Sequence, residues 1–203
     1  MKIICIGRNY AEHAKELKNE IPTEPVFFMK PDTALLKDNE DFFYPEHTKD
    51  LHHEVELVLK ISKAGKHIEE KFAHKYYDEI GIGIDFTARD IQATCKEKGL
   101  PWEKAKAFDG SAPVGKFIAK SLIKDIANIN FHLEINGKPR QSGNTKDLLF
   151  SFDKIITYVS KFVTLKTGDL IYTGTPEGVA AVTIGDKLSC FIEKENLLEF
   201  VVK

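Results

Sequence analysis

Two glutamates and an aspartate are the residues of this sequence best suited to chemistry. Glu54 and Glu56 lie two positions apart in LHHEVELVLKI, whose Val, Leu and Ile content predicts a β-strand. Side chains at i and i+2 of a strand project from one face, so the two carboxylates should lie side by side. Asp85 lies in GIGIDFT, an apolar run in which an unpaired carboxylate would be very costly. Three such carboxylates are hard oxygen ligands, suited to Mg²⁺, Mn²⁺ or Ca²⁺ rather than zinc.

Each of these acids also has a structural interpretation without a metal. Glu54 and Glu56 could form the solvated face of an amphipathic strand, and two adjacent carboxylates repel each other unless a cation or a proton lies between them. Asp85 could pair with Arg89 and cap the helix that follows. The neighbouring His53 could support a metal ligand by donating a hydrogen bond to it. The residues alone leave both interpretations open.

His13 and Glu16 form a candidate acid–base pair. They are three residues apart in a segment with helical character, so they share one helix face. A carboxylate that orients an imidazole can make it a general base. The alternative is an ordinary solvated pair on the helix surface.

Two lysines and a glycine-rich turn complete the candidate site. Lys30 ends the apolar run FFMKP, and Lys106 precedes the turn FDG, so either could bind a carboxylate substrate or stabilise an oxyanion. Residues 173–178, TGTPEG, offer free amides and two hydroxyl groups. This turn lacks the GxxxxGK[ST] spacing of a phosphate-binding loop.

The composition excludes several classes of protein. The length of 203 residues fits one domain over residues 1–203. The formal net charge of −2 gives no excess of positive charge for binding nucleic acid. No apolar run approaches the ~20 residues of a membrane span, and the N-terminus lacks a targeting pattern. We therefore expect a cytoplasmic protein. Cys5, Cys95 and Cys190 form no CxxC pair, which indicates reduced structural thiols.

The segments that must position these residues favour strands over helices. Strands are predicted over 2–6, 26–31, 52–61 and 81–87, and helices over 11–20, 67–80, 88–99 and 148–163. Asn136-Gly137 predicts a hairpin, Gly99 ends one helix, and Ser151 or Asp153 opens another. Because no regular βαβ alternation appears, we expect a mixed α+β or mostly-β domain and not a doubly wound sheet.

The ordered set of motifs resembles the fumarylacetoacetate hydrolase family. The motifs are GRNYAEHAKEL, FMKPDTALL, LHHEVELVL, GIGIDFTARDIQ, GLPWEKAKAFDGSAPVG, the block from GNTKDLLF to TGTPEGV, and IGDKL. They cover nearly the whole chain, and its length is similar to the single-domain branch that includes acylpyruvases and oxaloacetate decarboxylases. The resemblance implies an α+β, mostly-β fold: a mixed β-sandwich roll with a few peripheral helices. It also implies a homodimer with one Mg²⁺ or Mn²⁺ per subunit.

The same resemblance implies a role for each candidate residue. The metal ligands are Glu54, Glu56 and Asp85, the catalytic pair is His13 and Glu16, Lys106 faces the metal, and Arg89, Gln92, Lys30 and Thr175 match positions that bind substrate or support the ligands. The sequence departs from the family pattern at Ala107 and Ala180, which replace a frequent Ser and Gly. Both positions should lie beside the pocket and bear on the choice of substrate.

These roles imply a metal-dependent enzyme that acts on a small carboxylic acid. The leading hypothesis is hydrolysis of a C–C bond in an acylpyruvate or fumarylpyruvate, with His13 activating water and Lys106 stabilising the oxyanion. Decarboxylation of oxaloacetate would suit the same pocket. The alternative is isomerisation or tautomerisation of a 2-hydroxy-dienedioate or of oxaloacetate. It would use the same metal and the same chelating groups of the substrate, but it would move protons between carbons. A non-catalytic binding domain is disfavoured because the acids, the pair and the lysine are all present.

Overall fold

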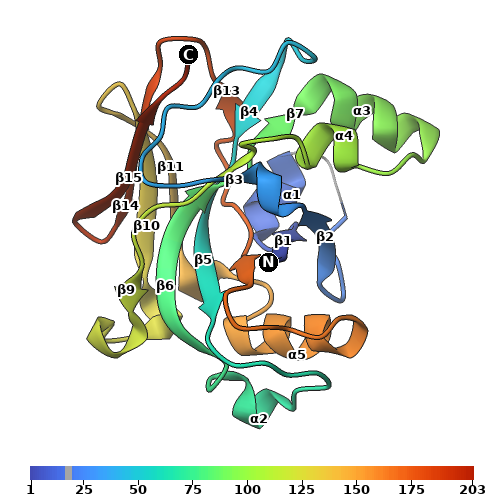
Figure 1. Cartoon of the computed structure of the whole chain (residues 1–203), viewed down its shortest axis with the longest axis vertical. Helices are drawn as coiled ribbons and strands as arrows, with labels where there is room; N and C mark the ends of the chain where they lie inside the picture. The colour runs from blue at the N-terminus through green and yellow to red at the C-terminus, as the bar shows by residue number, and fades with distance from the viewer. Residues whose placement is uncertain (17–19) are drawn as a thin grey trace.

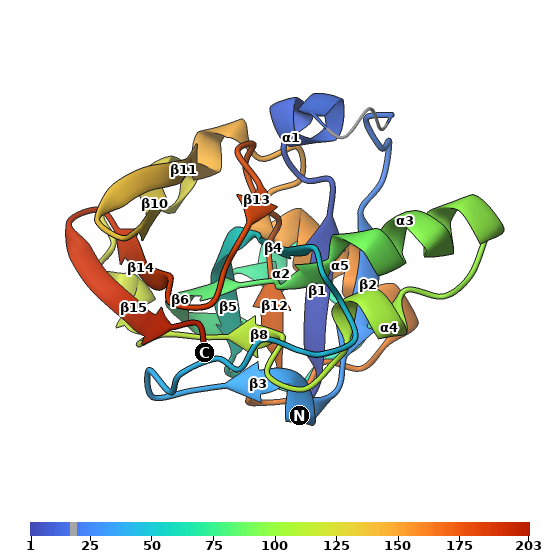
Figure 2. The same cartoon turned by 90° about the horizontal axis from the view of Figure 1, so that it is seen from above.

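The computed structural model describes residues 1–16 and 20–203, and it is mostly β with a few short helices. A six-stranded sheet and a four-stranded sheet contain most of the strand residues, and the helices lie around their edges (Figure 1). In the view from above, the four-stranded sheet lies on one side and helices α1, α3 and α4 lie on the other (Figure 2). This arrangement agrees with the mixed, mostly-β fold that the sequence predicts.

The six-stranded sheet contains the central strands of the fold. Its order is β2–β1–β12–β5–β6–β9, formed by Val26–Lys30, Ile3–Gly7, Leu170–Tyr172, Val55–Ile61, Tyr77–Ile84 and Ile118–Ala119. Strands β1 and β12 are parallel, and all other neighbours are antiparallel. Six of the seven residues of β5 are buried, which explains its nearly continuous apolar sequence.

The second sheet is antiparallel throughout. Its order is β11–β10–β14–β15, formed by Lys138–Asn144, Asn130–Ile135, Lys187–Ile192 and Glu195–Val201. Asn136 and Gly137 connect β10 to β11 with φ angles of 53° and 72°, as a tight hairpin turn requires, so the predicted hairpin is confirmed. Two small sheets add β13–β4–β7 (Ala180–Ala181, Leu51–His53, Thr87–Ala88) and β3–β8 (Leu35–Leu36, Ala112–Pro113).

The helices are short. They are α1 (Ala11–Glu16), α2 (Glu70–Ala73), α3 (Arg89–Lys98), α4 (Glu103–Lys106) and α5 (Phe152–Phe162), with 3₁₀ turns at Asp32–Ala34, Lys120–Leu122, Ile126–Asn128 and Thr145–Asp147. Of the two residues predicted to open α5, Ser151 is the cap, since its hydroxyl accepts the Lys154 N–H at 3.3 Å. Gly99 ends α3 with a φ of 63°, as predicted. Within the described ranges, no helix is long and apolar enough to cross a membrane.

One predicted helix is described only in part, and another differs from the structure. Residues 17–19 of the helix predicted over 11–20 lie outside the described residues. The helix predicted over 67–80 is wrong at its C-terminal end, because α2 ends at Ala73 and β6 begins at Tyr77. Pairing with β5 decides the outcome: Ile80 lies opposite Leu59, and both are fully buried. Burial within a sheet outweighs the local preference of the sequence.

One continuous core joins the two large sheets. Leu57 and Ile82 of the six-stranded sheet belong to the same buried cluster as Leu133, Leu188 and Phe200 of the four-stranded sheet. Strands β14 and β15 contact β6 directly. This close packing supports β5 and β6, so residues at the ends of these strands are held by a rigid framework.

Candidate metal centre and active site

Glu54, Glu56 and Asp85 converge at the ends of two paired strands. The strand predicted over 52–61 is interrupted at Glu54, between β4 and β5, and Asp85 lies between β6 and β7. The Asp85 N–H donates to the Glu54 carbonyl at 2.8 Å, and this hydrogen bond joins the β4–β5 junction to the β6–β7 junction. One carboxylate oxygen from each acid lies within 4.8 Å of the others, and the three residues are 5%, 2% and 1% exposed. The interpretation of Glu54 and Glu56 as a solvated strand face therefore fails.

Lys106, at the end of α4, contacts two of the three acids. Its Nζ donates to Glu54 Oε2 at 2.8 Å and to Asp85 Oδ2 at 2.7 Å. It also donates to Thr87 Oγ1 at 2.5 Å. These contacts use all three ammonium protons, so in this arrangement Lys106 orients the acids and is not free to face an oxyanion.

Lys30, at the end of β2, contacts the other side of Asp85. Its Nζ lies 2.8 Å from Asp85 Oδ1 and donates to the carbonyl and the hydroxyl of Ser111 at 2.8 and 3.0 Å. Asp85 thus lies between two buried lysines, rather than pairing with Arg89. Arg89 pairs instead with Glu54, at 2.5 Å between Nη2 and Oε1.

The charges of this cluster shift the proton affinities of its members in opposite directions. Burial raises the pKa of Glu56 well above its usual range, and the nearby Asp85 and Glu54 raise it further. Burial also acts to raise the pKa of Glu54, but Lys106 and Arg89 outweigh it and lower that pKa. Glu56 is therefore the acid whose charge lacks a cationic partner.

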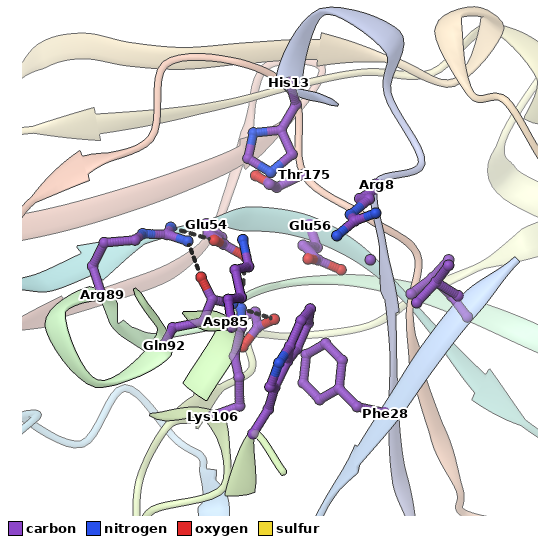
Figure 3. A pocket seen from close by; sticks show the side chains of 15 residues that line it. Arg8, His13, Phe28, Glu54, Glu56, Asp85, Arg89, Gln92, Lys106 and Thr175 are labelled. Atoms are coloured by element: carbon purple, nitrogen blue, oxygen red, sulfur yellow. Dashed lines mark hydrogen bonds and ion pairs between the residues drawn. The ribbon is translucent and has the colours of Figure 1, made fainter. Parts of the chain in front are cut away.

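His13 and Glu16 lie above the acids on α1. His13 is buried and lines the pocket together with Glu54 and Glu56, as Figure 3 shows. Its Nδ1 lies 3.3 Å from Glu16 Oε2, and the Glu16 carboxylate also accepts the Gly178 N–H at 3.1 and 3.2 Å. Glu16 thus connects the imidazole to the glycine-rich turn, as expected of a residue that orients a general base.

Three of the four residues predicted to bind substrate or support the ligands line the pocket. They are Arg89, Gln92 and Thr175, and Arg89 Nη1 donates to Gln92 Oε1 at 2.7 Å (Figure 3). The fourth, Lys30, does not line the pocket and contacts Asp85 instead. Ala107 and Ala180, expected beside the pocket, are not among the residues that line it. His53 contacts Gln141 at 2.8 Å rather than any of the three acids, so the predicted support of a ligand by His53 is not seen.

Sequence reasoning missed several residues that line the pocket, among them Arg8, Phe28, Lys96 and Trp102. Lys96 lies 5.6 Å from the centre of the Trp102 ring, and its pKa is lowered by burial and by the charges of Arg89 and Arg8. The motifs GRNY and GLPW contain Arg8 and Trp102, but nothing in their spacing indicates that they meet at one pocket.

The three cysteines are structural residues. Cys5, Cys95 and Cys190 are free and buried, as predicted for structural thiols. Burial raises the pKa of Cys5 well above its usual range, and burial raises the pKa of Cys190 in the same way. Neither thiol is set up as a nucleophile.

The donor set fits an oxygen-ligated divalent cation. All three candidate ligands are carboxylates, and burial together with the nearby charge of Asp85 raises the pKa of Glu56. The oxygens are close enough to share one ion, and no histidine or cysteine offers a ligand atom within the group. This chemistry favours Mg²⁺ or Mn²⁺ over zinc. Glu54, Glu56 and Asp85 would hold the ion.

Comparisons with known proteins identify the family. A family model described as fumarylacetoacetate (FAA) hydrolase C-terminal matches residues 2–202. The chain therefore belongs to this family, as the motifs indicated.

Three relatives show the range of activities named within it. Mitochondrial oxaloacetate tautomerase FAHD1 of Mus musculus is 43% identical over 201 residues, which cover 99% of this chain and 91% of that protein. Mitochondrial oxaloacetate decarboxylase of Dictyostelium discoideum is 44% identical over 192 residues, covering 94% and 88%. A crystal structure of fumarylpyruvate hydrolase from Pseudomonas aeruginosa, in complex with Mn²⁺ and pyruvate, matches with a TM-score of 0.94 and 36% identity, covering 100% of this chain and 89% of that one.

Proposed function

We propose that this protein is a divalent-metal-dependent oxaloacetate tautomerase, which interconverts the keto and enol forms of that acid. The observation that carries the proposal is the buried group of three carboxylates directly below His13. The full-length similarity to an oxaloacetate tautomerase supports the choice of reaction.

The charge of the site favours a dicarboxylate substrate. The three acids are matched in number by three cations in contact with the cluster, namely Lys30, Lys106 and Arg89. A divalent ion would therefore add a positive excess, and Arg8 and Lys96 line the same pocket. Oxaloacetate, a dianion at neutral pH, complements this excess better than a monocarboxylic acylpyruvate does.

The protein groups can account for the proton transfers. A bound divalent ion would supply a Lewis acid that polarises the 2-oxo group and stabilises negative charge on it. His13, oriented by Glu16, would take the enol proton and deliver a proton to C3, so the reaction needs no net gain or loss of protons. Arg89 and Thr175 line the pocket and can donate to the anionic oxygens of the substrate.

Acylpyruvate or fumarylpyruvate hydrolysis is a second candidate, and the His13–Glu16 pair favours it over decarboxylation, as the pair also favours tautomerisation. Hydrolysis requires a base that activates water, whereas decarboxylation of oxaloacetate does not. The similarity to a fumarylpyruvate hydrolase structure supports this candidate. Decarboxylation remains a third reaction that the same site could perform, as the name of the Dictyostelium relative suggests.

The test separates the three reactions on one sample. We would follow the ultraviolet absorbance of enol-oxaloacetate and of acetylpyruvate with purified protein, in Mg²⁺ and in EDTA, and assay pyruvate at the end. Tautomerisation predicts Mg²⁺-dependent loss of enol absorbance above the protein-free rate, with little pyruvate. Pyruvate from acetylpyruvate would favour hydrolysis, and pyruvate from oxaloacetate alone would favour decarboxylation. No change with either compound would contradict the proposal.

The assembly and location of the protein stay predictions. We propose a homodimer in solution, which light scattering at a known concentration can test. The cytoplasmic location expected from the sequence can be tested by fractionating cells of the source organism.

A further inference from the structure

Gln141 connects the candidate active site to a strand on which its nearest neighbours are exposed. It lies on β11, where Lys138, Pro139, Arg140 and Ser142 are exposed, yet Gln141 is only 2% exposed. A buried amide must satisfy two donors and one acceptor, so its partners are informative.

The orientation of the Gln141 amide is fixed by its surroundings. The Val55 N–H, which can only donate, lies 3.1 Å from the atom assigned as Oε1. A flipped amide would place its NH₂ group against this donor, so the assignment is determined by chemistry. His53 Nδ1 lies 2.8 Å from the same oxygen and must therefore carry a proton and donate to it.

This orientation determines what the Thr175 hydroxyl can do. The Gln141 NH₂ group donates to Thr175 Oγ1 and to the Pro176 carbonyl, both at 2.9 Å. Because Oγ1 accepts from Gln141, the hydroxyl proton of Thr175 must point elsewhere. Thr175 is 3% exposed and lines the pocket beside His13 and Glu56, so that proton can be donated to a bound anion.

The same turn holds two other groups of the site. The Gly174 N–H donates to Glu56 Oε2 at 2.7 Å, and the Gly178 N–H donates to the Glu16 carboxylate. By holding Pro176, between these two glycines, Gln141 anchors the turn at its centre. By anchoring this turn, Gln141 helps to position Thr175 and the two backbone N–H groups that hold Glu56 and Glu16.

We propose that Gln141 is a positioning residue, held by His53 and Val55, that makes the Thr175 hydroxyl a committed donor to a carboxylate oxygen of the substrate. The inference rests on the proposed function in one respect: it takes the bound ligand of this pocket to be a carboxylate. It does not depend on which reaction follows binding.

The test is a double-mutant cycle on the affinity for oxalate, a stable dicarboxylate, measured by calorimetry with Mg²⁺-loaded protein. Gln141→Glu keeps the shape but presents an oxygen to Thr175, which turns the Thr175 proton away from the pocket. Thr175→Val removes the hydroxyl. Each single change should weaken oxalate binding about tenfold, the value of one hydrogen bond to a charged group. The loss in the double variant should be clearly smaller than the sum of the two single losses, because both changes remove the same donor. Ser142→Ala, an exposed neighbour on β11, is the matched control and should bind as wild type does.

Equal additive losses in the cycle would overturn the inference, because they would mean that Gln141 acts on the pocket only through general structure. Unchanged oxalate binding in Gln141→Glu would overturn it as well, and so would a wild-type protein that does not bind oxalate. If wild type binds oxalate but leaves oxaloacetate unchanged, the proposed function fails and the cycle still decides the role of Gln141.

A second measurement needs no variant. In ¹⁵N-detected spectra of the histidine side chains, with the Mg²⁺-bound protein, His53 should appear as the neutral tautomer protonated at Nδ1. Protonation at Nε2 instead would mean that the Gln141 amide has the opposite orientation, and the inference would be wrong.

Discussion

The carboxylate centre and the segment that covers it are built in different ways. Glu54, Glu56 and Asp85 lie at the ends of strands in the main sheet and are at most 5% exposed. His13 and Glu16 lie on the six-residue helix α1, and the Glu16 side chain is 33% exposed. Their mutual contact is 3.3 Å long, whereas the lysine contacts below are 2.7 and 2.8 Å. The ion-binding centre thus belongs to the main sheet, whereas the base, although buried itself, is oriented by a partly exposed residue of a short helix, so the two can vary independently.

This difference is consistent with the activities of the relatives. An oxaloacetate tautomerase, an oxaloacetate decarboxylase and a fumarylpyruvate hydrolase share at least 36% identity with this chain. All three reactions can pass through a stabilised enolate, so a common centre can serve them. The positions of the base and of the donors around it then decide which bond changes.

The largest effect should come from Asp85→Asn, which removes the charge of one of the three candidate metal ligands. Metal affinity and enol turnover should fall at least about a hundredfold, since residues that only support metal ligands already account for 10–100-fold. The variant also leaves Lys30 and Lys106 facing a neutral side chain, which should lower the free energy of unfolding by about 3 kcal/mol. Calorimetry with Mn²⁺, the enol assay and urea unfolding measure these effects. Asp78→Asn, an exposed site on the preceding strand β6, is the matched control.

His13→Ala tests helix α1, the segment that covers the centre, and should affect catalysis without affecting metal binding. Tautomerisation should slow about a hundredfold or more, the usual contribution of a general base. Mn²⁺ binding should stay within twofold of wild type, because His13 contacts none of the three acids through a hydrogen bond. Lys15→Ala on the same helix is the control for α1 itself. Loss of metal binding in His13→Ala would show that the two regions do not act independently.

Glu16→Gln sharpens the comparison, because it keeps the shape of the side chain and removes its charge. We expect turnover to fall about tenfold, since the imidazole loses the carboxylate that orients it. Glu12→Gln, an exposed acid on α1, should have no effect. Equal rates for Glu16→Gln and wild type would reduce Glu16 to a structural contact with Gly178.

Ser151→Ala should have the smallest effect and should alter neither the carboxylate centre nor helix α1. Removing the cap of α5 should lower the free energy of unfolding by about 1 kcal/mol in a denaturant titration. Enol turnover at 25 °C should match wild type. A loss of activity without a loss of stability would mean that α5 contributes to the site in a way that its contacts do not explain.

The sequence predicted some parts of this molecule better than others, for physical reasons. Glu54, Glu56 and Asp85 stood out because acids in apolar strands are costly and therefore informative. The strand at Tyr77 was missed because pairing with β5, and not local preference, decides its conformation. Gln141 gave no signal, since it is a polar residue among exposed neighbours on β11, and it is buried by contacts with two distant parts of the chain, at His53–Val55 and at Thr175–Pro176.

Anomalous diffraction from crystals grown with Mn²⁺ would test the central claim most directly. The account predicts one strong peak per chain, with Glu54, Glu56 and Asp85 all contributing oxygen ligands at about 2.0–2.2 Å, as for other small divalent ions. Lys106 should remain beside the acids in the same crystals. The absence of a peak at this position, or a single peak held by other residues, would contradict the account.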